Sequence, residues 1–393
     1  MNMKKIDIIK YRLECGIGCK YIPELCDVTH LALAVKYGSN NDILNGTAHF
    51  LEHMLLEFNS SDISYHSNFS IIGTTMLDHT VYTISFTTNH LCFREALFIL
   101  QDISSGANLK KEHLEKVRQD LVDEYVRVTN QATYHMYKEL FEKYHISEKY
   151  PLGTLDNIKK ISYKDLIVAY KSGYNNTNMC LSVVGAPYKW MSQINTIFKC
   201  PGYGRNESRQ KKPNIKTDDI FGGPPTLDYV HVFFKVDTNI LSLKNHEIIE
   251  SIAITLIEEL FKLIINKADM EAFPSVIRFD RTNYFIRYLF KNDNYTESYI
   301  NEVIHDVLCL LRRDEQLSNL INEIIKEYNL LLNNEEFNSY NYNKHLVECF
   351  LYDLNEYRNE DLLEELNNIT PRDVLLFSVS LISTCGHFIY FMQ

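Results

Sequence analysis

Apolar and polar residues alternate in several short stretches of the chain, which is the pattern of strands with one buried face. The clearest stretches lie at residues 30–37, 80–87, 179–184, 229–236, 275–290 and 387–392. Between them, apolar residues recur at steps of three and four, which predicts helices. Such helices are expected at residues 45–57, 110–143 and 246–267.

The two halves of the chain share one order of elements. Each begins with a strand, continues with a helix, more strands and long helices, and ends on an apolar strand. Two copies of one unit is the economical interpretation of this repeat. Alternation in the strands favours mainly antiparallel sheets with helices packed on one face. The predicted fold class is therefore α+β, with two homologous domains of this kind.

A segment rich in glycine, proline and charge separates the two halves. Residues 200–225 have the sequence CPGYGRNESRQKKPNIKTDDIFGGPP and little apolar periodicity, which is typical of a linker. We expect a first domain at residues 1–200, a linker at 201–224 and a second domain at 225–393. A chain of 393 residues suits two domains of ordinary size.

Composition and charge exclude several functional classes. The formal net charge of −11 argues against a nucleic-acid partner, because phosphate binding needs a basic face. No apolar stretch approaches the roughly 20 residues that a membrane span needs. The N-terminal apolar run is short and interrupted by charge, unlike a signal peptide. We therefore expect no nucleic-acid partner, no membrane span and a cytoplasmic protein.

The nine cysteines are scattered and odd in number. Cys15 and Cys19 form a C-x3-C pair with Cys26 nearby, which is compatible with a zinc knuckle. No second pair lies at metal-ligand spacing, so reduced and partly buried thiols are the favoured interpretation. The pattern leaves a role for Cys15, Cys19 and Cys26 open.

One helical segment carries a metal-ligand pattern. Residues 45–58 have the sequence NGTAHFLEHMLLEF, in which His49 and His53 lie one helical turn apart and can reach one ion. Glu52 is offset beside them, where it can take a proton from a water activated by zinc. This is the inverted zinc-peptidase motif. Asn45 or Thr47 is the expected N-cap of the helix.

A zinc site of this type needs a third protein ligand. The helix expected at 110–143 has an apolar stripe, and Glu124 occupies a position in it that calls for an apolar side chain. Glu124 is therefore the favoured third ligand, and Glu115 is the second choice. The alternative for Glu124 is an ion pair with Arg118 or Arg127.

These motifs resemble the pitrilysin or insulinase family of inverzincins in its half-length form. That form includes the processing-peptidase subunits of mitochondria and small bacterial peptidases. The resemblance covers the first domain. It rests on Gly38-Ser39, on residues 46–54, on the pattern from Gly73 to Tyr82, on residues 150–154 and on residues 183–185.

The resemblance implies a role for each matched position. His49, His53 and Glu124 would bind one Zn²⁺ per chain, and Glu52 would be the general base. A peptide substrate would pair as an added strand with an edge strand, whose backbone hydrogen bonds recognise an extended peptide rather than a particular sequence. That edge strand comprises Ile72, Gly73, Thr74, Thr75 and Met76. Ile72-Gly73 replaces the family's usual Asn-Ala, so this chain lacks that asparagine side chain.

The second half departs from the family pattern. Alignment places Ile265 and Phe273 where the family often has an Arg and a Tyr that reach the substrate. Neither side chain offers the same hydrogen bonds. We therefore expect the chain to be the zinc subunit of a heterodimer whose homologous partner supplies the Arg/Tyr pair. A homodimer is the alternative.

Three functions fit this pattern. The favoured one is a zinc endopeptidase that cleaves short or unfolded peptides held as an added strand. The family resemblance suggests one such task, the processing of a ribosomally made peptide (leader removal or bacteriocin maturation). The second is a non-catalytic peptide-binding or scaffold subunit of a related protease complex, a class that usually loses the metal ligands. The third is a structural zinc site. It is disfavoured because such sites normally have four protein ligands.

Overall fold

The computed structural model of the chain describes residues 7–57, 69–199, 214–217, 229–237, 246–265, 273–291, 295–334, 338–383 and 385–392. Within these ranges, no helix combines the length and the apolar character that a bilayer crossing needs.

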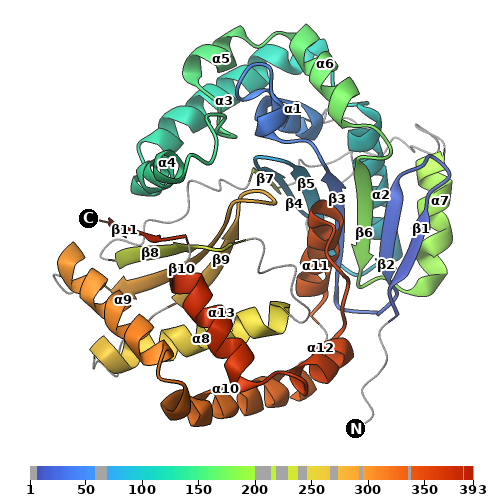
Figure 1. The fold of residues 1–393 in the computed structure, drawn as a ribbon. Helices are drawn as coiled ribbons and strands as arrows, with labels where there is room; N and C mark the ends of the chain where they lie inside the picture. Colours follow the sequence, from blue (N-terminus) through green and yellow to red (C-terminus); the bar gives the residue numbers. More distant parts are fainter. Residues whose placement is uncertain are drawn as a thin grey trace.

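A seven-stranded sheet, here called the first sheet, forms the centre of the first half (Figure 1). Its strands, in spatial order, are β1 (Ile9–Arg12), β2 (Gly18–Ile22), β6 (Met179–Val184), β3 (Val28–Val35), β5 (Thr80–Thr87), β4 (Ser70–Thr75) and β7 (Asn214–Thr217). Two neighbouring pairs, β2 with β6 and β4 with β7, are parallel, and the others are antiparallel. The prediction of a mainly antiparallel sheet is confirmed.

The second half contains a four-stranded antiparallel sheet, the second sheet. Its strands, in spatial order, are β11 (His387–Phe391), β8 (Tyr229–Lys235), β10 (Tyr284–Lys291) and β9 (Phe273–Arg278). The predicted strands 229–236, 275–290 and 387–392 correspond to these elements. The α+β fold class is therefore confirmed.

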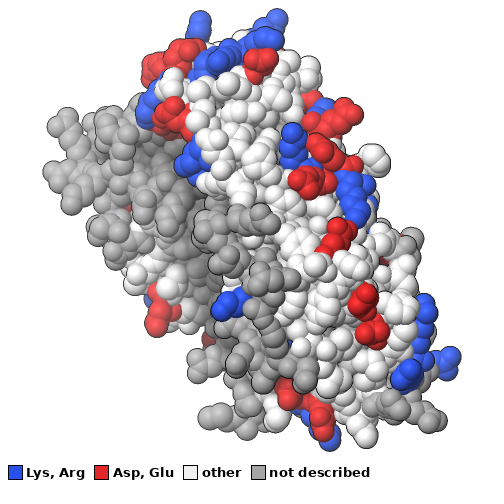
Figure 2. All heavy atoms as spheres, turned by 90° about the vertical axis from the view of Figure 1, so that its left-hand side faces the viewer, with Lys and Arg blue, Asp and Glu red and all other residues white. Residues whose placement is uncertain are grey.

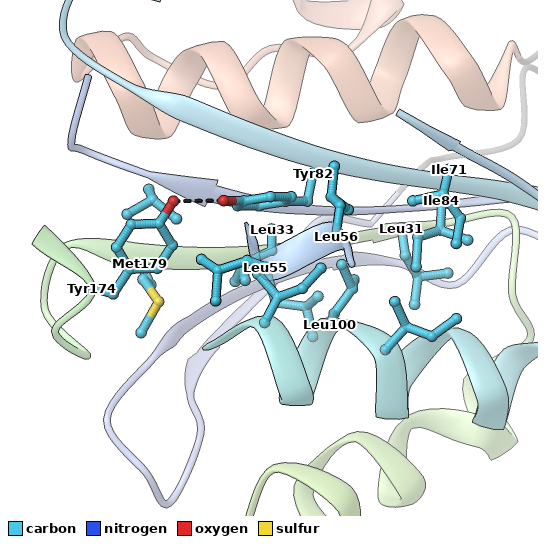
Figure 3. Packing of buried hydrophobic residues seen from close by; sticks show 14 of the residues in the cluster. Leu31, Leu33, Leu55, Leu56, Ile71, Tyr82, Ile84, Leu100, Tyr174 and Met179 are labelled. Atoms are coloured by element: carbon cyan, nitrogen blue, oxygen red, sulfur yellow. Dashed lines mark hydrogen bonds between the residues drawn. The ribbon is translucent and has the colours of Figure 1, made fainter. Parts of the chain in front are cut away.

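Helices α1 and α2 cover one face of the first sheet. The helices of this half are α1 (Thr47–Leu56), α2 (His90–Ser105), α3 (Leu114–Thr129), α4 (Ala132–Tyr144), α5 (Leu155–Lys160), α6 (Tyr163–Gly173) and α7 (Met191–Lys199), with 3-10 turns at Ser39–Asn41, Lys111–His113 and Tyr188–Trp190. Figure 3 shows Leu55, Leu56 and Leu100 from α1 and α2 packed beside strand residues such as Leu33 and Ile84. Each buried leucine stabilises the packing by roughly 1.5–3 kcal/mol.

Most helices of the second half pack on the second sheet around a separate apolar core. They are α8 (His246–Ile265), α9 (Glu297–Leu311), α10 (Asp314–Asn334), α12 (Asn359–Leu366) and α13 (Pro371–Ser383). The remaining helix of this half, α11 (Ser339–Tyr352), packs on the first sheet instead.

The single helix predicted at residues 110–143 is wrong in one respect, because the structure divides it into α3 and α4. The side chains of Thr129 and Asn130 donate to the carbonyls of Tyr125 and Val126 at the end of α3. Such local bonds satisfy carbonyls that a continuing helix would use. Gln131 then adopts an extended backbone, and α4 begins in a new direction.

Each half contributes one helix to the sheet of the other half (Figure 1). From α4, Tyr137 and Phe141 pack edge-on against Phe279, which follows β9 in the second half. From α11, Val347 and Leu351 pack against β3 of the first sheet. The first sheet thus has helices on both faces, whereas the pattern predicted them on one. The two halves are interlocked rather than joined only by a linker.

Within the predicted linker at 201–224, the structure describes residues 214–217, and these form strand β7 beside β4. The rest of that segment lies outside the described residues. The domain boundaries at residues 200 and 225 stay a prediction.

Charges of both signs lie among one another on the face shown in Figure 2. On this face, the net charge of −11 is therefore not gathered into one acidic surface.

Candidate metal centre

Helix α1 begins at a buried turn that is held by a residue earlier in the chain, Asp42. The expected N-cap, Asn45 or Thr47, is wrong: Gly46 is the N-cap residue, with a left-handed backbone at φ 99°. The carboxylate of Asp42 accepts the backbone N–H groups of Gly46 and Ala48, both at 2.9 Å. Burial raises the pKa of Asp42 to about 7, although these N–H donors oppose the rise. Asp42 therefore fixes the start of the helix.

The same turn packs directly on the segment 150–154. A Cβ atom on Gly46 would lie 3.0 Å from the Cα of Gly153, and one on Gly153 would lie 2.6 Å from the Cα of Gly46. Both residues also have positive φ angles, which favour glycine. Gly46 and Gly153, both part of the sequence motifs, thus allow their two backbone segments to come into contact at the N-terminus of α1.

The structure brings His49, His53 and Glu124 together. The Nε2 atoms of His49 and His53 are 3.1 Å apart. The carboxylate of Glu124 lies 3.2 Å from His53 Nε2 through Oε2 and 3.8 Å from His49 Nε2 through Oε1. Helix α1 supplies the two rings from successive turns, and α3 supplies the carboxylate. Among the residues that the structure describes, this is the only group of three His, Cys, Asp or Glu side chains close enough to share an ion.

Glu124 is held as a buried carboxylate beside the histidines. It is only 7% exposed. Burial alone would raise the pKa of Glu124, but the charge of His49, the hydrogen bond and charge of His53 and, last, the charge of Arg127 outweigh burial and lower that pKa to about 2. Arg127 is more distant, with its Nη2 4.0 Å from Glu124 Oε1. The histidines are therefore the nearer partners of Glu124.

The second-choice ligand, Glu115, lies elsewhere on α3. Its exposed carboxylate pairs with Arg118, which also donates to the carbonyl of Ile161. Neither Glu115 nor Arg118 belongs to the cluster.

These three side chains fit a zinc ion. Two imidazole nitrogens and one carboxylate oxygen form a known set of three protein ligands for catalytic zinc. Ligand atoms bound at about 2.0–2.1 Å in tetrahedral geometry lie roughly 3.3 Å from one another. The 3.1 Å between the two histidine nitrogens and the 3.2 Å from His53 Nε2 to Glu124 Oε2 are close to that value. The other carboxylate oxygen, Oε1, lies 3.8 Å from His49 Nε2.

Glu52 points from the same helix toward strand β4. It is 1% exposed, and Thr75 Oγ1 donates to its Oε2 at 2.6 Å. Glu52 is not one of the three clustered ligands. This placement beside the metal ligands fits the predicted role of Glu52 as a base rather than a ligand.

Strand β4 presents two different faces. Ile71, Gly73 and Thr75 are buried on the side of α1. Ile72 and Thr74, together with Met76 just beyond the end of the strand, line a cavity of about 640 Å³ between the first sheet and the second half. The predicted substrate strand thus lies between the candidate metal centre and this cavity.

Strand β4 is not an edge strand, contrary to the sequence-based expectation. Residues 70–73 pair in parallel with β7, so a part of the chain itself occupies the position of an added strand. Met76 also uses its own backbone groups: its N–H donates to His79 O, and its carbonyl accepts from Ser39 N–H. The partner strand β7 comes from a segment that resembles a linker, so the local sequence does not reveal the pairing.

The cavity contains ionisable residues that the sequence pattern did not indicate. Glu247 and Glu250 of α8 and Arg278 of β9 contribute to its lining. Burial raises the pKa of Glu247 to about 7 and that of Glu250 to about 8. Their position follows from contact between the two halves, which no local motif records.

The two departures in the second half lie at the ends of neighbouring elements. Ile265 is the last residue of α8 and is buried in the second core. Phe273 is the first residue of β9. Neither position can provide a guanidinium or phenol group to the candidate site.

Comparison with known proteins agrees with this arrangement. Residues 26–152 match the family model of insulinase, peptidase family M16. The chain carries a domain of peptidase family M16. The matched region includes His49, Glu52, His53 and Glu124, and it ends just before Gly153.

Two curated relatives show the same kinship. The chain is 27% identical over 161 residues to a mitochondrial-processing peptidase subunit beta of Arabidopsis thaliana, a match that covers 37% of this chain and 29% of that protein. It is 27% identical over 146 residues to a Bacillus subtilis protein named as the zinc protease AlbF, covering 36% of this chain and 34% of AlbF. The matches thus span about a third of each relative's length.

Solved structures share the whole fold at low identity. An M16-like peptidase from Alicyclobacillus acidocaldarius superposes with a TM-score of 0.74 and 16% identity, covering 98% of both chains. An inactive M16 peptidase domain from Pseudomonas fluorescens superposes with a TM-score of 0.70 and 12% identity, covering 98% of this chain and 97% of that one. An M16 domain described as inactive therefore shares this fold, so the fold alone does not establish peptidase activity.

The ligand set predicts the outcome of two matched substitutions on α3. Glu124→Gln should lose most of the bound zinc, because it removes the only carboxylate of the cluster. Glu115→Gln should keep the wild-type content of about one zinc per chain, because Glu115 is exposed on α3 and lies outside the cluster. Elemental analysis of the purified proteins measures both. Equal zinc contents in the two variants would contradict the assignment of Glu124.

Proposed function

We propose that this chain is a zinc-dependent endopeptidase that cleaves short or unfolded peptides. The observation that carries the proposal is the convergence of His49, His53 and Glu124 with Glu52 buried beside them. A domain of peptidase family M16 and a relative named as a zinc protease support it. The trimming of a ribosomally made peptide, expected from the family resemblance, is the proposed biological task.

Each residue has a distinct role in the proposed reaction. His49, His53 and Glu124 would hold the zinc ion. When bound, zinc supplies Lewis-acid chemistry and lowers the pKa of water to about 7. Glu52 accepts the proton of the attacking water and then delivers it to the leaving amine, which requires a base within hydrogen-bonding reach of both.

Strand β4 would hold the peptide as an added strand. Backbone pairing selects an extended chain and not a particular sequence, which suits short or unfolded substrates. Side chains on one face of such a peptide would point toward the metal centre, and those on the other face toward the cavity side. Because β7 pairs with residues 70–73, the peptide must displace β7 there.

A non-catalytic scaffold is the second candidate, since an inactive M16 domain shares this fold. The feature that favours the enzyme is the complete set of His49, Glu52, His53 and Glu124. Burying charged groups costs free energy. A scaffold that binds no metal would gain nothing from a buried carboxylate and two histidines held in contact.

We further propose that the chain acts with a homologous partner subunit. Support comes from Ile265 and Phe273, which stand where the family resemblance expects an Arg and a Tyr, and from a relative that is itself named as a subunit. A homodimer is the alternative.

The general-base role predicts a separation of metal binding from cleavage. Glu52→Gln should retain about one zinc per chain, because Glu52 is not a ligand, yet lose peptide cleavage. Cleavage is measured by mass spectrometry on a tryptic digest of casein, with zinc content measured on the same samples. Wild-type protein without zinc, or a Glu52→Gln variant that cleaves at the wild-type rate, would contradict the proposal.

The pairing of β7 with β4 predicts competition with the peptide. Replacement of residues 214–217 by Gly-Ser-Gly-Ser should speed amide hydrogen exchange at residues 70–73, because β7 no longer protects them. In the Glu52→Gln background, the same replacement should tighten binding of a casein peptide by about 3- to 10-fold, since no internal strand competes. Unchanged exchange and unchanged affinity would exclude competition at this strand.

The partner proposal predicts co-purification. Affinity purification of this chain from its native host should recover a second M16 chain that carries the Arg and the Tyr. Addition of that chain should raise kcat/KM on the casein peptides. Full activity of this chain alone, with no increase on addition of any partner, would favour the homodimer.

A further inference from the structure

One side chain of β4 bonds directly to the candidate general base. The hydroxyl Oγ1 of Thr75 donates to Oε2 of Glu52 at 2.6 Å, a short and charge-assisted hydrogen bond. Thr75 is 3% exposed and Glu52 is 1% exposed. A bond to a carboxylate in such a buried place constrains it more strongly than the same bond in water would.

A second residue of β4 provides space for the same carboxylate. A Cβ atom on Gly73 would lie 2.2 Å from Oε1 and 2.8 Å from Cδ of Glu52. Residues two apart on a strand share a face, so Gly73 and Thr75 act from the same side. Glu52 therefore fits into a recess formed by a missing side chain at Gly73 and a hydroxyl at Thr75.

The strand and the helix that carry these groups are packed as one unit. Leu56 of α1 lies in the same apolar cluster as Ile71 of β4 and Tyr82 of β5 (Figure 3). A Cβ atom on Gly73 would also lie 2.7 Å from Leu56 Cδ1. The distance between Thr75 and Glu52 is therefore set by buried packing and not by the rotation of one exposed side chain.

We infer that Thr75 is a positioning residue for Glu52, and that Gly73 makes room for the positioned carboxylate. Thr75 fixes Oε2 of Glu52 by its hydrogen bond, while Oε1 lies over Gly73, so β4 places both carboxylate oxygens. Because β4 is also the strand proposed to hold the peptide, one element would align both the substrate and the base. The catalytic role of Thr75 rests on the proposed function, whereas the hydrogen bond between Thr75 and Glu52 does not depend on it.

Thr75→Val tests the inference because valine keeps the shape and removes the hydroxyl. We expect kcat on the fastest-cleaved casein peptide to fall about 10- to 100-fold, the effect of losing a hydrogen bond to a charged group. KM should change by less than about twofold and zinc content should stay at about one per chain, since Thr75 is not a ligand. Thr75→Ser, which restores the hydroxyl, should recover kcat to within about threefold of wild type.

Thr80→Val is the matched control. Thr80 lies directly opposite Thr75 on β5, is fully buried, and donates its hydroxyl to the carbonyl of Tyr37. Its substitution should lower stability but leave kcat per folded, zinc-loaded chain near wild type. A wild-type kcat in Thr75→Val, a Thr75→Ser variant as slow as Thr75→Val, or an equal loss in Thr80→Val would overturn the inference.

A double-mutant cycle separates failure of the inference from failure of the proposed function. In metal-free protein, Thr75→Val should lower the urea midpoint of unfolding, and this loss should shrink when Glu52 is first replaced by Leu. If the effects of the two substitutions on stability are non-additive but the chain cleaves no peptide, the proposed function is overturned and the contact between Thr75 and Glu52 stands. An additive cycle would overturn the contact, whatever the peptidase activity.

Discussion

The site depends on the burial of helix α1 between strand β4 and helix α3. This helix carries His49, Glu52 and His53 into an interior where unpartnered polar groups are costly. Each of these groups has a partner from another element: Glu124 of α3 for the histidines, and Thr75 of β4 for Glu52. Asp42 compensates the N–H groups at the start of the helix. The polar interior of α1 is thus satisfied by three separate segments, and these same contacts define the candidate active site.

The interlocked halves place this site beside a cavity. Helices α4 and α11 each pack on the opposite half, so the second half forms the far wall of the space next to β4. Strand β4 therefore separates the candidate metal centre on one face from a cavity lined by both halves on the other. In the described structure β7 closes the remaining side of β4, so access by a peptide involves an exchange of one strand for another.

Much of this arrangement was predictable where the information is local. The turn-to-turn spacing of His49 and His53 requires only a helix, and Glu124 is visible as a carboxylate in an apolar stripe. Features that depend on distant contacts were not predictable in the same way. Asp42 caps α1 from a separate turn, and the division of α3 from α4 depends on side-chain bonds at Thr129 and Asn130. The pairing of β7 with β4 joins segments more than a hundred residues apart, for which no periodicity gives a signal.

X-ray absorption at the zinc edge of the zinc-loaded protein tests the central claim most directly, because it reports the ligand atoms themselves. We expect two imidazole nitrogens and oxygen ligands at about 2.0–2.2 Å, no sulfur, and an unchanged spectrum when Glu52 is replaced by Gln. A sulfur shell at about 2.3 Å, or a spectrum that changes with Glu52, would contradict it.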